Sequence, residues 1–257
     1  MGALENLLTG LADGSVDLVD LTVPLTDRTP IIQLPPPFNN TRGLTLEELS
    51  HYDDRGPAWY WNDLSLGEHA GTHFDAPVHW ITGRDRSTID RVPVRHLVAP
   101  VVLIDRSSES EANPDFLLEI DDVRAWERDH GPLPEGGWLL YRTGWDRRAS
   151  DQAAFLNVDD TGSHTPGVSP ACAKWLAQEA PILGLGVETV GTDAGMAATF
   201  DPPFPCHSFL HGAGKYGLTS LVNLDRVPPT GSVLIATPLP IVGGSGSPAR
   251  ALALVPR

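Results

Sequence analysis

Eleven consecutive residues read His69-Ala70-Gly71-Thr72-His73-Phe74-Asp75-Ala76-Pro77-Val78-His79. This stretch concentrates side chains that bind metals or exchange protons, and all of them have odd numbers: His69, His73, Asp75 and His79. Successive side chains of an extended backbone point to opposite faces, so residues two, four or six positions apart share one face. We therefore expect an extended stretch whose polar groups converge on one point.

A helix explains the same stretch less well. It would bring only part of the set onto one face, and Pro77 lacks the amide that a helix interior needs. The helical zinc motif H-E-x-x-H also requires Glu where Ala70 stands. Imidazole and carboxylate ligands suit zinc, manganese or iron, so the stretch predicts a metal site. The alternative is a chance grouping of structural histidines.

The composition narrows the function classes. The 257 residues are 41% hydrophobic and 20% charged, and their formal net charge is -15. This balance is typical of a globular protein, and the chain has no Lys/Arg stripe of the kind that binds nucleic acid. No apolar run approaches the length of a membrane span, and the N-terminus has too little basic charge for a signal peptide. We expect a protein that binds neither nucleic acid nor a membrane.

Two cysteines, Cys172 and Cys206, are too few for a disulfide scaffold and indicate a reducing, cytoplasmic compartment. Cys206 precedes a histidine, so a nucleophilic thiol is one interpretation. A small, partly buried residue is the interpretation that the surrounding sequence favours, because no thiol-protease signature accompanies it.

Hydrophobic patterning predicts one α/β domain with about nine strands, four or five helices, and no internal repeat. Strands are expected, besides the histidine stretch, at 16–23, 59–66, 98–105, 137–143, 182–187, 218–224, 232–237 and 249–255. Helices are expected at 4–12, 45–52, 120–129 and 170–180, the second because Thr45-Leu46-Glu47-Glu48 resembles a capping box. The long connections 24–44 and 144–166 are expected to shape a pocket.

Aromatic residues cluster near the histidine stretch and are candidates for the wall of a pocket that takes a planar substrate. They are Trp59, Trp61 and Trp80; Phe38, in the loop 24–44, could also cover a pocket, with a packed surface loop as its alternative. Core packing is the alternative, and we expect it for at least one of Trp59 and Trp61. Trp80 is the stronger pocket candidate because it follows His79 directly.

The histidine stretch resembles the H-x-G-T-H-x-D-x-P-x-H signature of the metal-dependent cyclase superfamily, which includes bacterial kynurenine formamidases and isatin hydrolases. It matches at every signature position. Weaker similarity spans most of the chain, at Asp20-Leu21-Thr22, Gly191-Thr192-Asp193, His207, Leu221-Val222-Asn223-Leu224-Asp225 and Pro248-Ala249-Arg250. The resemblance implies a swivelling β/β/α fold over residues 1–257, usually as a homodimer or larger assembly.

The resemblance also implies roles for the site residues. His69, His73 and Asp75 would be metal ligands, and His79 a catalytic acid or base. Zinc is usual for the formamidases and manganese for the isatin hydrolases. The formamidases carry a Glu that helps to hold a second zinc, whereas this chain reads Leu218-Thr219-Ser220-Leu221 there. We therefore expect one divalent metal, Mn or Zn, in a site closer to that of isatin hydrolase, with Ser220 nearby.

The resulting hypothesis is hydrolysis of a cyclic amide, such as an isatin-like lactam, to a carboxylate. The metal would acidify a water molecule and polarise the carbonyl, and His79 would accept the proton of the water. His207 would orient the substrate or stabilise the new carboxylate, and the aromatic residues would stack on a small aromatic substrate. The alternatives are an arylformamidase that acts on N-formylkynurenine and a catalytically idle metal-binding protein. A Ser-His-Asp hydrolase is not favoured, because no G-x-S-x-G elbow is present.

Overall fold

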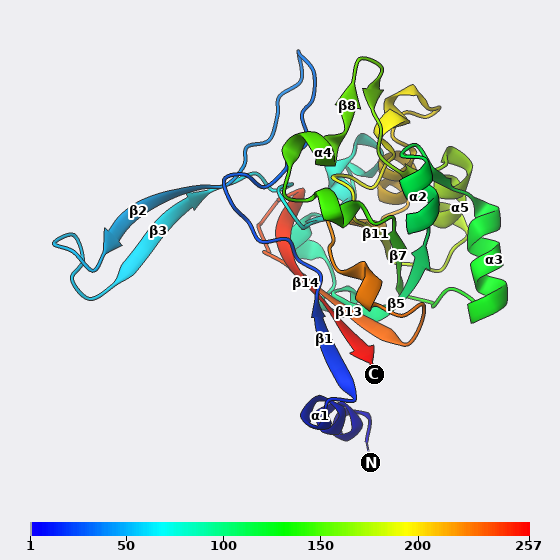
Figure 1. Ribbon diagram of the computed structural model, residues 1–257, viewed down its shortest axis with the longest axis horizontal. Coiled ribbons are helices and arrows are strands. Elements are labelled where there is room, and N and C mark those ends of the chain that lie inside the picture. Colours follow the sequence, from blue (N-terminus) through cyan, green and yellow to red (C-terminus); the bar gives the residue numbers. More distant parts are fainter. Residues whose placement is uncertain (1) are drawn as a thin grey trace.

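The computed structural model describes residues 2–257, and its largest sheet arranges eight strands of these residues in the order β1-β14-β13-β5-β7-β11-β12-β4. In that order the bounds are β1 Val16–Asp20, β14 Gly246–Pro256, β13 Ser232–Pro238, β5 Val98–Asp105, β7 Trp138–Arg142, β11 Gly184–Val187, β12 Tyr216–Thr219 and β4 His73–Asp75. The run from β5 to β12 is parallel, and the other pairs are antiparallel. Because β14 also pairs with β4, the strands from β14 to β4 close into a barrel to which β1 is added (Figure 1).

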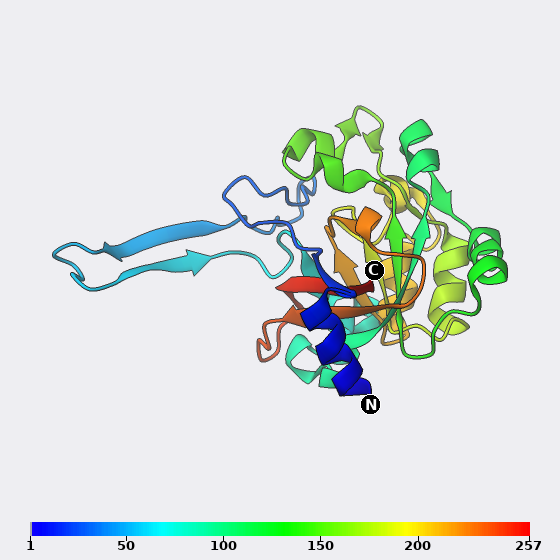
Figure 2. The same ribbon diagram turned by 60° about the horizontal axis from the view of Figure 1, so that its bottom comes forward.

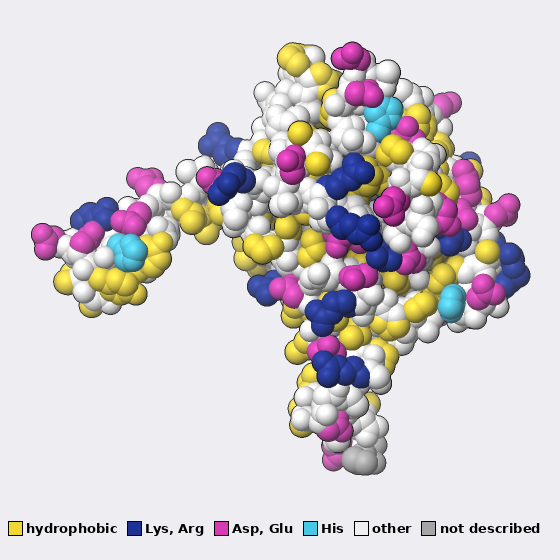
Figure 3. Space-filling view, in the orientation of Figure 1, with side chains coloured by type: hydrophobic (Ala, Val, Ile, Leu, Met, Phe, Trp, Pro, Cys, Tyr) yellow, Lys and Arg dark blue, Asp and Glu magenta, His cyan; other side chains and the backbone are white. Residues whose placement is uncertain are grey.

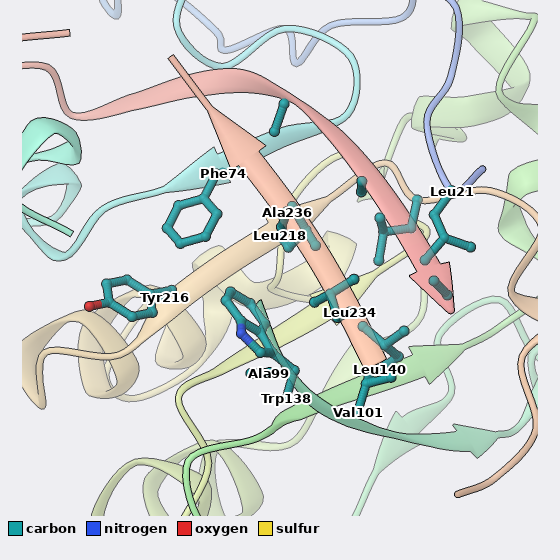
Figure 4. Packing of buried hydrophobic residues seen from close by; sticks show 14 of the residues in the cluster. Leu21, Phe74, Ala99, Val101, Trp138, Leu140, Tyr216, Leu218, Leu234 and Ala236 are labelled. Carbon is teal, nitrogen blue, oxygen red and sulfur yellow. The ribbon is translucent and has the colours of Figure 1, made fainter. Parts of the chain in front are cut away.

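Side chains of β7 show how the parallel strands are buried on both faces. Trp138 and Leu140 point into the barrel, where they belong to one apolar cluster with Phe74, Tyr216 and Leu234 (Figure 4). Leu139 and Tyr141, on the opposite face, belong to a second cluster under the helices. Alternation along a strand sends neighbours to opposite faces, and both faces are apolar here because both are covered.

Two helices cover the outer face of the parallel strands, α3 Ile120–His130 and α5 Pro170–Gln178 (Figure 1). Trp126 of α3 and Leu176 of α5 contribute to the second apolar cluster. The Ser169 hydroxyl accepts a hydrogen bond from the Cys172 amide at 3.2 Å, and Pro170 is the first helical residue. This N-terminus is the one that the sequence predicts. The expected swivelling β/β/α-type fold, with a mixed sheet and short helices, is confirmed.

A two-stranded arm projects from the body of the molecule (Figures 1 and 2). It consists of the antiparallel strands β2 Thr45–His51 and β3 Tyr60–Ser65. The prediction of a helix at 45–52 is therefore wrong. The capping pattern is a local preference, and cross-strand pairing with residues 60–65 overrides it.

The remaining elements, apart from the 11-residue helix α1, are short. They are the helices α1 Ala3–Asp13, α2 Ser107–Ala112 and α4 Gln152–Leu156, and the strands β6 Leu117–Leu118, β8 Val158–Asp159, β9 Gly162–Ser163 and β10 Gly167–Val168. Single turns of 3-10 helix are η1 Pro77–His79, η2 Ile81–Gly83, η3 Ile89–Arg91, η4 Val94–His96, η5 Trp145–Arg148, η6 Gly195–Thr199 and η8 Leu224–Arg226, and η7 His207–His211 is a π-helical turn. Within residues 2–257, no helix combines the length and the apolar character that a membrane crossing requires.

Candidate active site

The histidine stretch is extended only over β4 and bends on both sides of it. Gly71 has a φ of 61°, a left-handed conformation that favours glycine, and η1 turns the chain after Pro77. A Cβ atom on Gly71 would also lie 2.5 Å from the Leu25 side chain. The prediction that the whole stretch is extended is wrong outside β4. The polar side chains still converge, because the two bends return the flanking histidines toward the strand.

Asp75 lies at the centre of the predicted ligands. Its Oδ1 is 2.8 Å from His69 Nδ1 and 3.3 Å from His73 Nε2, and only 1% of the residue is exposed. Burial acts to raise the pKa of the Asp75 carboxyl, but His73 and His69 outweigh it and hold that pKa well below its usual range. The structure thus places an ionised carboxylate between two imidazoles.

Polar groups outside the predicted ligand set orient both of these imidazoles. Ser245 Oγ lies 2.9 Å from His69 Nε2 and donates a hydrogen bond to Glu68 Oε2 at 2.5 Å. His73 Nδ1 lies 2.8 Å from the Gly71 carbonyl oxygen. Such outer contacts fix the ring orientation and tautomer of histidines that bind metals.

His79 stacks on His69, with ring centroids 3.9 Å apart and planes inclined by 28°. Burial lowers the pKa of the His79 imidazole to about 2, and the neighbouring histidines act in the same direction. The ring is therefore neutral near pH 7 in the metal-free protein. A neutral imidazole has a lone pair that can accept a proton.

The turn η7 brings two more histidines to Asp75. One potential ligand atom from each of Asp75, His207 and His211 lies within 4.8 Å of the other two, and the same holds for His69, Asp75 and His79. His211 is buried, its Nδ1 donates to the Lys215 carbonyl at 3.0 Å, and its Nε2 has no hydrogen-bond partner among residues 2–257. An unpartnered nitrogen beside a buried carboxylate suits a cation, so this donor set fits a metal such as manganese or zinc.

Asp193 positions His207. Its Oδ2 lies 2.5 Å from His207 Nδ1, and its Oδ1 accepts a hydrogen bond from the Cys206 amide at 2.7 Å. Burial acts to lower the pKa of His207, but Asp193 outweighs it and raises that pKa. Because Nδ1 is engaged, Nε2 is the nitrogen of His207 that remains for a ligand.

Known proteins resemble this chain over most of its length. Residues 19–194 match the family model described as "Putative cyclase". The chain belongs to the cyclase family. It is 51% identical to the isatin hydrolase of Roseibium aggregatum over 258 aligned residues, which cover 99% of this chain and 98% of that protein. It is 31% identical to the kynurenine formamidase of Salinibacter ruber over 191 residues, which cover 74% of this chain and 77% of that one.

Solved structures in this family superpose on the whole chain. A crystal structure of an isatin hydrolase bound to the product analogue thioisatinate has a TM-score of 0.97 at 50% identity and covers 100% of both chains. Isatin hydrolase A from Ralstonia solanacearum has a TM-score of 0.96 at 49% identity, with 99% of this chain and 98% of that chain covered.

The other residues predicted for this cyclase-family site fall into two groups. Trp80 packs beside His207, with ring centroids 4.8 Å apart, and Ser220 adjoins Thr219, whose hydroxyl lies within 3.1 Å of both ring nitrogens of His73. Phe38 is 64% exposed, and Trp59 and Trp61, 47% and 56% exposed, lie on the arm. The fold of one chain does not bring these three to the cluster.

Three residues of the site were not predicted from the sequence. His211 follows His207 by four positions, and this helical spacing is a signal that could have found it. Asp193 ends the Gly191-Thr192-Asp193 pattern, which the resemblance had marked without giving it a role. Ser245 lies in the glycine-rich connection before β14, and no local pattern connects it with His69.

His164 lies at the base of the β8–β9 hairpin, and its contribution to the stability of the fold depends on pH. Its Nδ1 lies 2.8 Å from Asp115 Oδ2 and its Nε2 lies 3.2 Å from Asp159 Oδ1, and the bond to Asp115 raises the pKa of His164 above 6.5. A raised pKa in the folded state adds stability below pH 6.5 that is lost as the pH rises through the folded value. We expect His164→Gln to lower Tm more at pH 5.5 than at pH 9.

Thermal melts across this pH range, with Asp115→Asn beside wild type, check this expectation. Asp115→Asn keeps the shape of the partner but removes its charge, so it should flatten the same pH dependence. A Tm difference for His164→Gln that is equal at both pH values would contradict the assignment.

Proposed function

We propose that this chain is a metal-dependent amide hydrolase that opens the lactam of isatin or a related small aromatic substrate to a carboxylate. The observation that carries the proposal is the convergence of His69, His73 and His79 on the buried carboxylate of Asp75. Full-length similarity to isatin hydrolase supports the substrate class. The proposed unit is the whole chain, residues 1–257, and two buried free cysteines support a cytoplasmic location.

One divalent metal, manganese or zinc, would be held by His69, His73 and Asp75. When bound, such a metal acidifies a water molecule and polarises the substrate carbonyl. Ser245 and the Gly71 carbonyl hold His69 and His73 in position, so these side chains need little reorientation when the metal binds.

His79 moves the proton. Its neutral imidazole accepts a proton from the attacking water as the new C–O bond forms. The same imidazole nitrogen then donates that proton to the lactam nitrogen of the substrate as the C–N bond breaks. Stacking against His69 and burial hold the imidazole on the ligand side of the site. His207, fixed by Asp193, presents Nε2 to the substrate or to the carboxylate that forms.

A panel assay tests the proposal. Purified protein is incubated with manganese or zinc and then offered isatin, N-formylkynurenine and simple lactams. We expect isatin to be consumed and isatinate to accumulate. Turnover of none of these compounds with either metal would remove the hydrolase assignment.

Arylformamidase activity is the second candidate, because the S. ruber kynurenine formamidase is 31% identical. In the related formamidases a Glu helps to hold a second zinc, and this chain has Thr219 in that segment. Metal content per chain separates the two candidates. Two tightly bound zinc ions, with N-formylkynurenine consumed faster than isatin, would favour the formamidase.

The arm supports assembly into a homodimer or a larger oligomer. Six large apolar side chains are exposed on it or at its tip, namely Leu46, Tyr52, Trp59, Tyr60, Trp61 and Leu64. Hydrophobic side chains gather near the end and the root of the arm in Figure 3. An isolated two-stranded hairpin is marginally stable in water, so a second copy of the chain that covers these side chains would stabilise it. Trp59 and Trp61, and Phe38 in the loop before the arm, would then line the pocket of that second copy.

We expect Trp59→Ser combined with Trp61→Ser to dissociate the oligomer and to lower kcat/KM at least tenfold. The measurements are light scattering after size-exclusion chromatography and the isatin assay. Val242→Ser is the matched control, because Val242 is 86% exposed but lies in the loop before β14. An unchanged oligomer with unchanged activity in the double variant would remove the arm from the interface.

A further inference from the structure

A cavity of about 520 Å³ opens beside His207. It is bounded by residues 32–35 of the long N-terminal loop, by the β8–β9 hairpin, and by the segment from Val190 to Phe204. Cavities of roughly 300 to 1,000 Å³ hold drug-sized ligands, whereas a bicyclic lactam is a much smaller molecule. The site therefore has room beyond the reacting ring.

The walls of this cavity are mainly apolar, and the neutral polar side chains among the described lining residues are Gln33, Ser163 and Thr165. Its apolar lining includes Leu34, Leu156, Val158, Ala194, Ala198 and Phe204. The one carboxylate among the described lining residues is Asp193, and its oxygens are already engaged by His207 and the Cys206 amide. No Lys or Arg is among the described lining residues, so a charged group that entered this cavity would lose hydration without meeting a free opposite charge, which is unfavourable.

The walls are also held in place. The His164 amide donates to the Asn157 carbonyl at 3.0 Å, and Asn157 Nδ2 donates back to the His164 carbonyl at 2.7 Å, so the hairpin is closed at its base. A Cβ atom on Gly195 would lie only 2.4 Å from the Ser163 carbonyl oxygen, so the hairpin packs directly against the next wall. On the third side, the Ile31 amide and carbonyl both bond to the Gln152 side chain, at 2.9 and 2.7 Å.

We propose that this cavity binds an uncharged apolar substituent on the substrate, so that the preferred substrates are lactams whose aromatic ring carries a bulky apolar group. The inference rests on the proposed function and extends it from the reacting ring to the rest of the substrate. The lactam carbonyl lies toward the His69–Asp75–His79 cluster, and the substituent passes His207 and Phe204 into the cavity. Specificity then depends on the size and polarity of the substituent.

The test compares isatin with isatins that carry a phenyl group or a carboxylate at each of the four benzo-ring positions. With the metal-loaded enzyme, we expect at least one phenyl isatin to have a KM at least fivefold below that of isatin, and no carboxylate analogue to do so. Two variants narrow the cavity, Ala198→Trp and Val158→Trp, and each should lower the ratio of kcat/KM for that phenyl isatin to kcat/KM for isatin at least tenfold. Val94→Trp is the matched control, because it makes the same change at a side chain that is 78% exposed in η4 and does not line the cavity, and it should leave this ratio within twofold of wild type.

The outcomes separate the inference from the function on which it rests. If wild type hydrolyses isatin but no phenyl isatin better, or if the tryptophan variants leave the ratio unchanged, the cavity is not a substituent pocket and the hydrolase assignment stands. If one of the two tryptophan variants fails to fold, the result for the other variant tests the inference. Turnover of no compound at all would overturn the proposed function, and the inference with it.

Discussion

Replacing Asp75 with asparagine is expected to lower kcat/KM for isatin about a thousandfold and to abolish tight metal binding. The carboxylate is buried and lies between His69 and His73, so it supplies the negative charge that balances a cation there. A bound metal contributes several kcal/mol of transition-state stabilisation, and about 4 kcal/mol corresponds to a factor of about a thousand in rate. Asparagine keeps the shape of the side chain, so the loss reports on charge.

Metal content after dialysis and the isatin assay measure the two parts of this result. The matched control is Asp85→Asn, which makes the same chemical change at a side chain that is 90% exposed. Circular dichroism and a thermal melt establish that the variant is folded. If Asp75→Asn retained its metal and lost less than tenfold in kcat/KM, Asp75 would not be a ligand.

Replacing His79 with glutamine is expected to lower kcat about a thousandfold while the metal stays bound. Proton transfer by a positioned side chain contributes about 10² to 10⁴ in rate, and glutamine can donate and accept hydrogen bonds but cannot carry the proton. The imidazole is largely buried and stacks on His69, so a water molecule cannot easily take its place as the proton acceptor. The effect should therefore lie near the middle of that range.

The His79 variant also separates the remaining interpretations. The matched control is His130→Gln at the exposed C-terminus of α3. Full turnover with the metal bound would support a catalytically idle role for His79. Loss of the metal would instead make His79 a ligand, which its ligand-atom distance of at most 4.8 Å from both His69 and Asp75 allows.

The sequence predicted which side chains lie together better than it predicted how the chain brings them together. Parity along a strand correctly grouped His69, His73, Asp75 and His79, but the chain achieves this convergence with a left-handed bend at Gly71 and a turn after Pro77. Those bends depend on contacts with Leu25 and with the loop before β14, which are distant in sequence. A pattern confined to eleven residues does not contain them.

Tertiary pairing explains the errors elsewhere. Residues 45–52 carry a helix-like capping pattern, yet they pair with residues 60–65 in an arm that local propensity does not predict. Most core strands were predicted well, because strands buried on both faces are nearly continuous apolar runs, as in β7, where only the last residue, Arg142, is charged. His211 was missed as a site residue because its proximity to Asp75 depends on how η7 packs against the barrel.

The pairing of β14 with β4 has a consequence for how the enzyme is made. Gly246 lies opposite Asp75 and Pro248 opposite His73, so the strand that carries two proposed ligands is closed by residues more than 170 positions later. Contacts between such distant segments form slowly, because the loop between them must be ordered first. During synthesis on the ribosome, the sheet edge beside these ligands therefore stays unpaired until β14 emerges, and stable metal loading follows the pairing of β14 with β4. A nascent chain stalled before residue 246 would have every predicted ligand and no finished site.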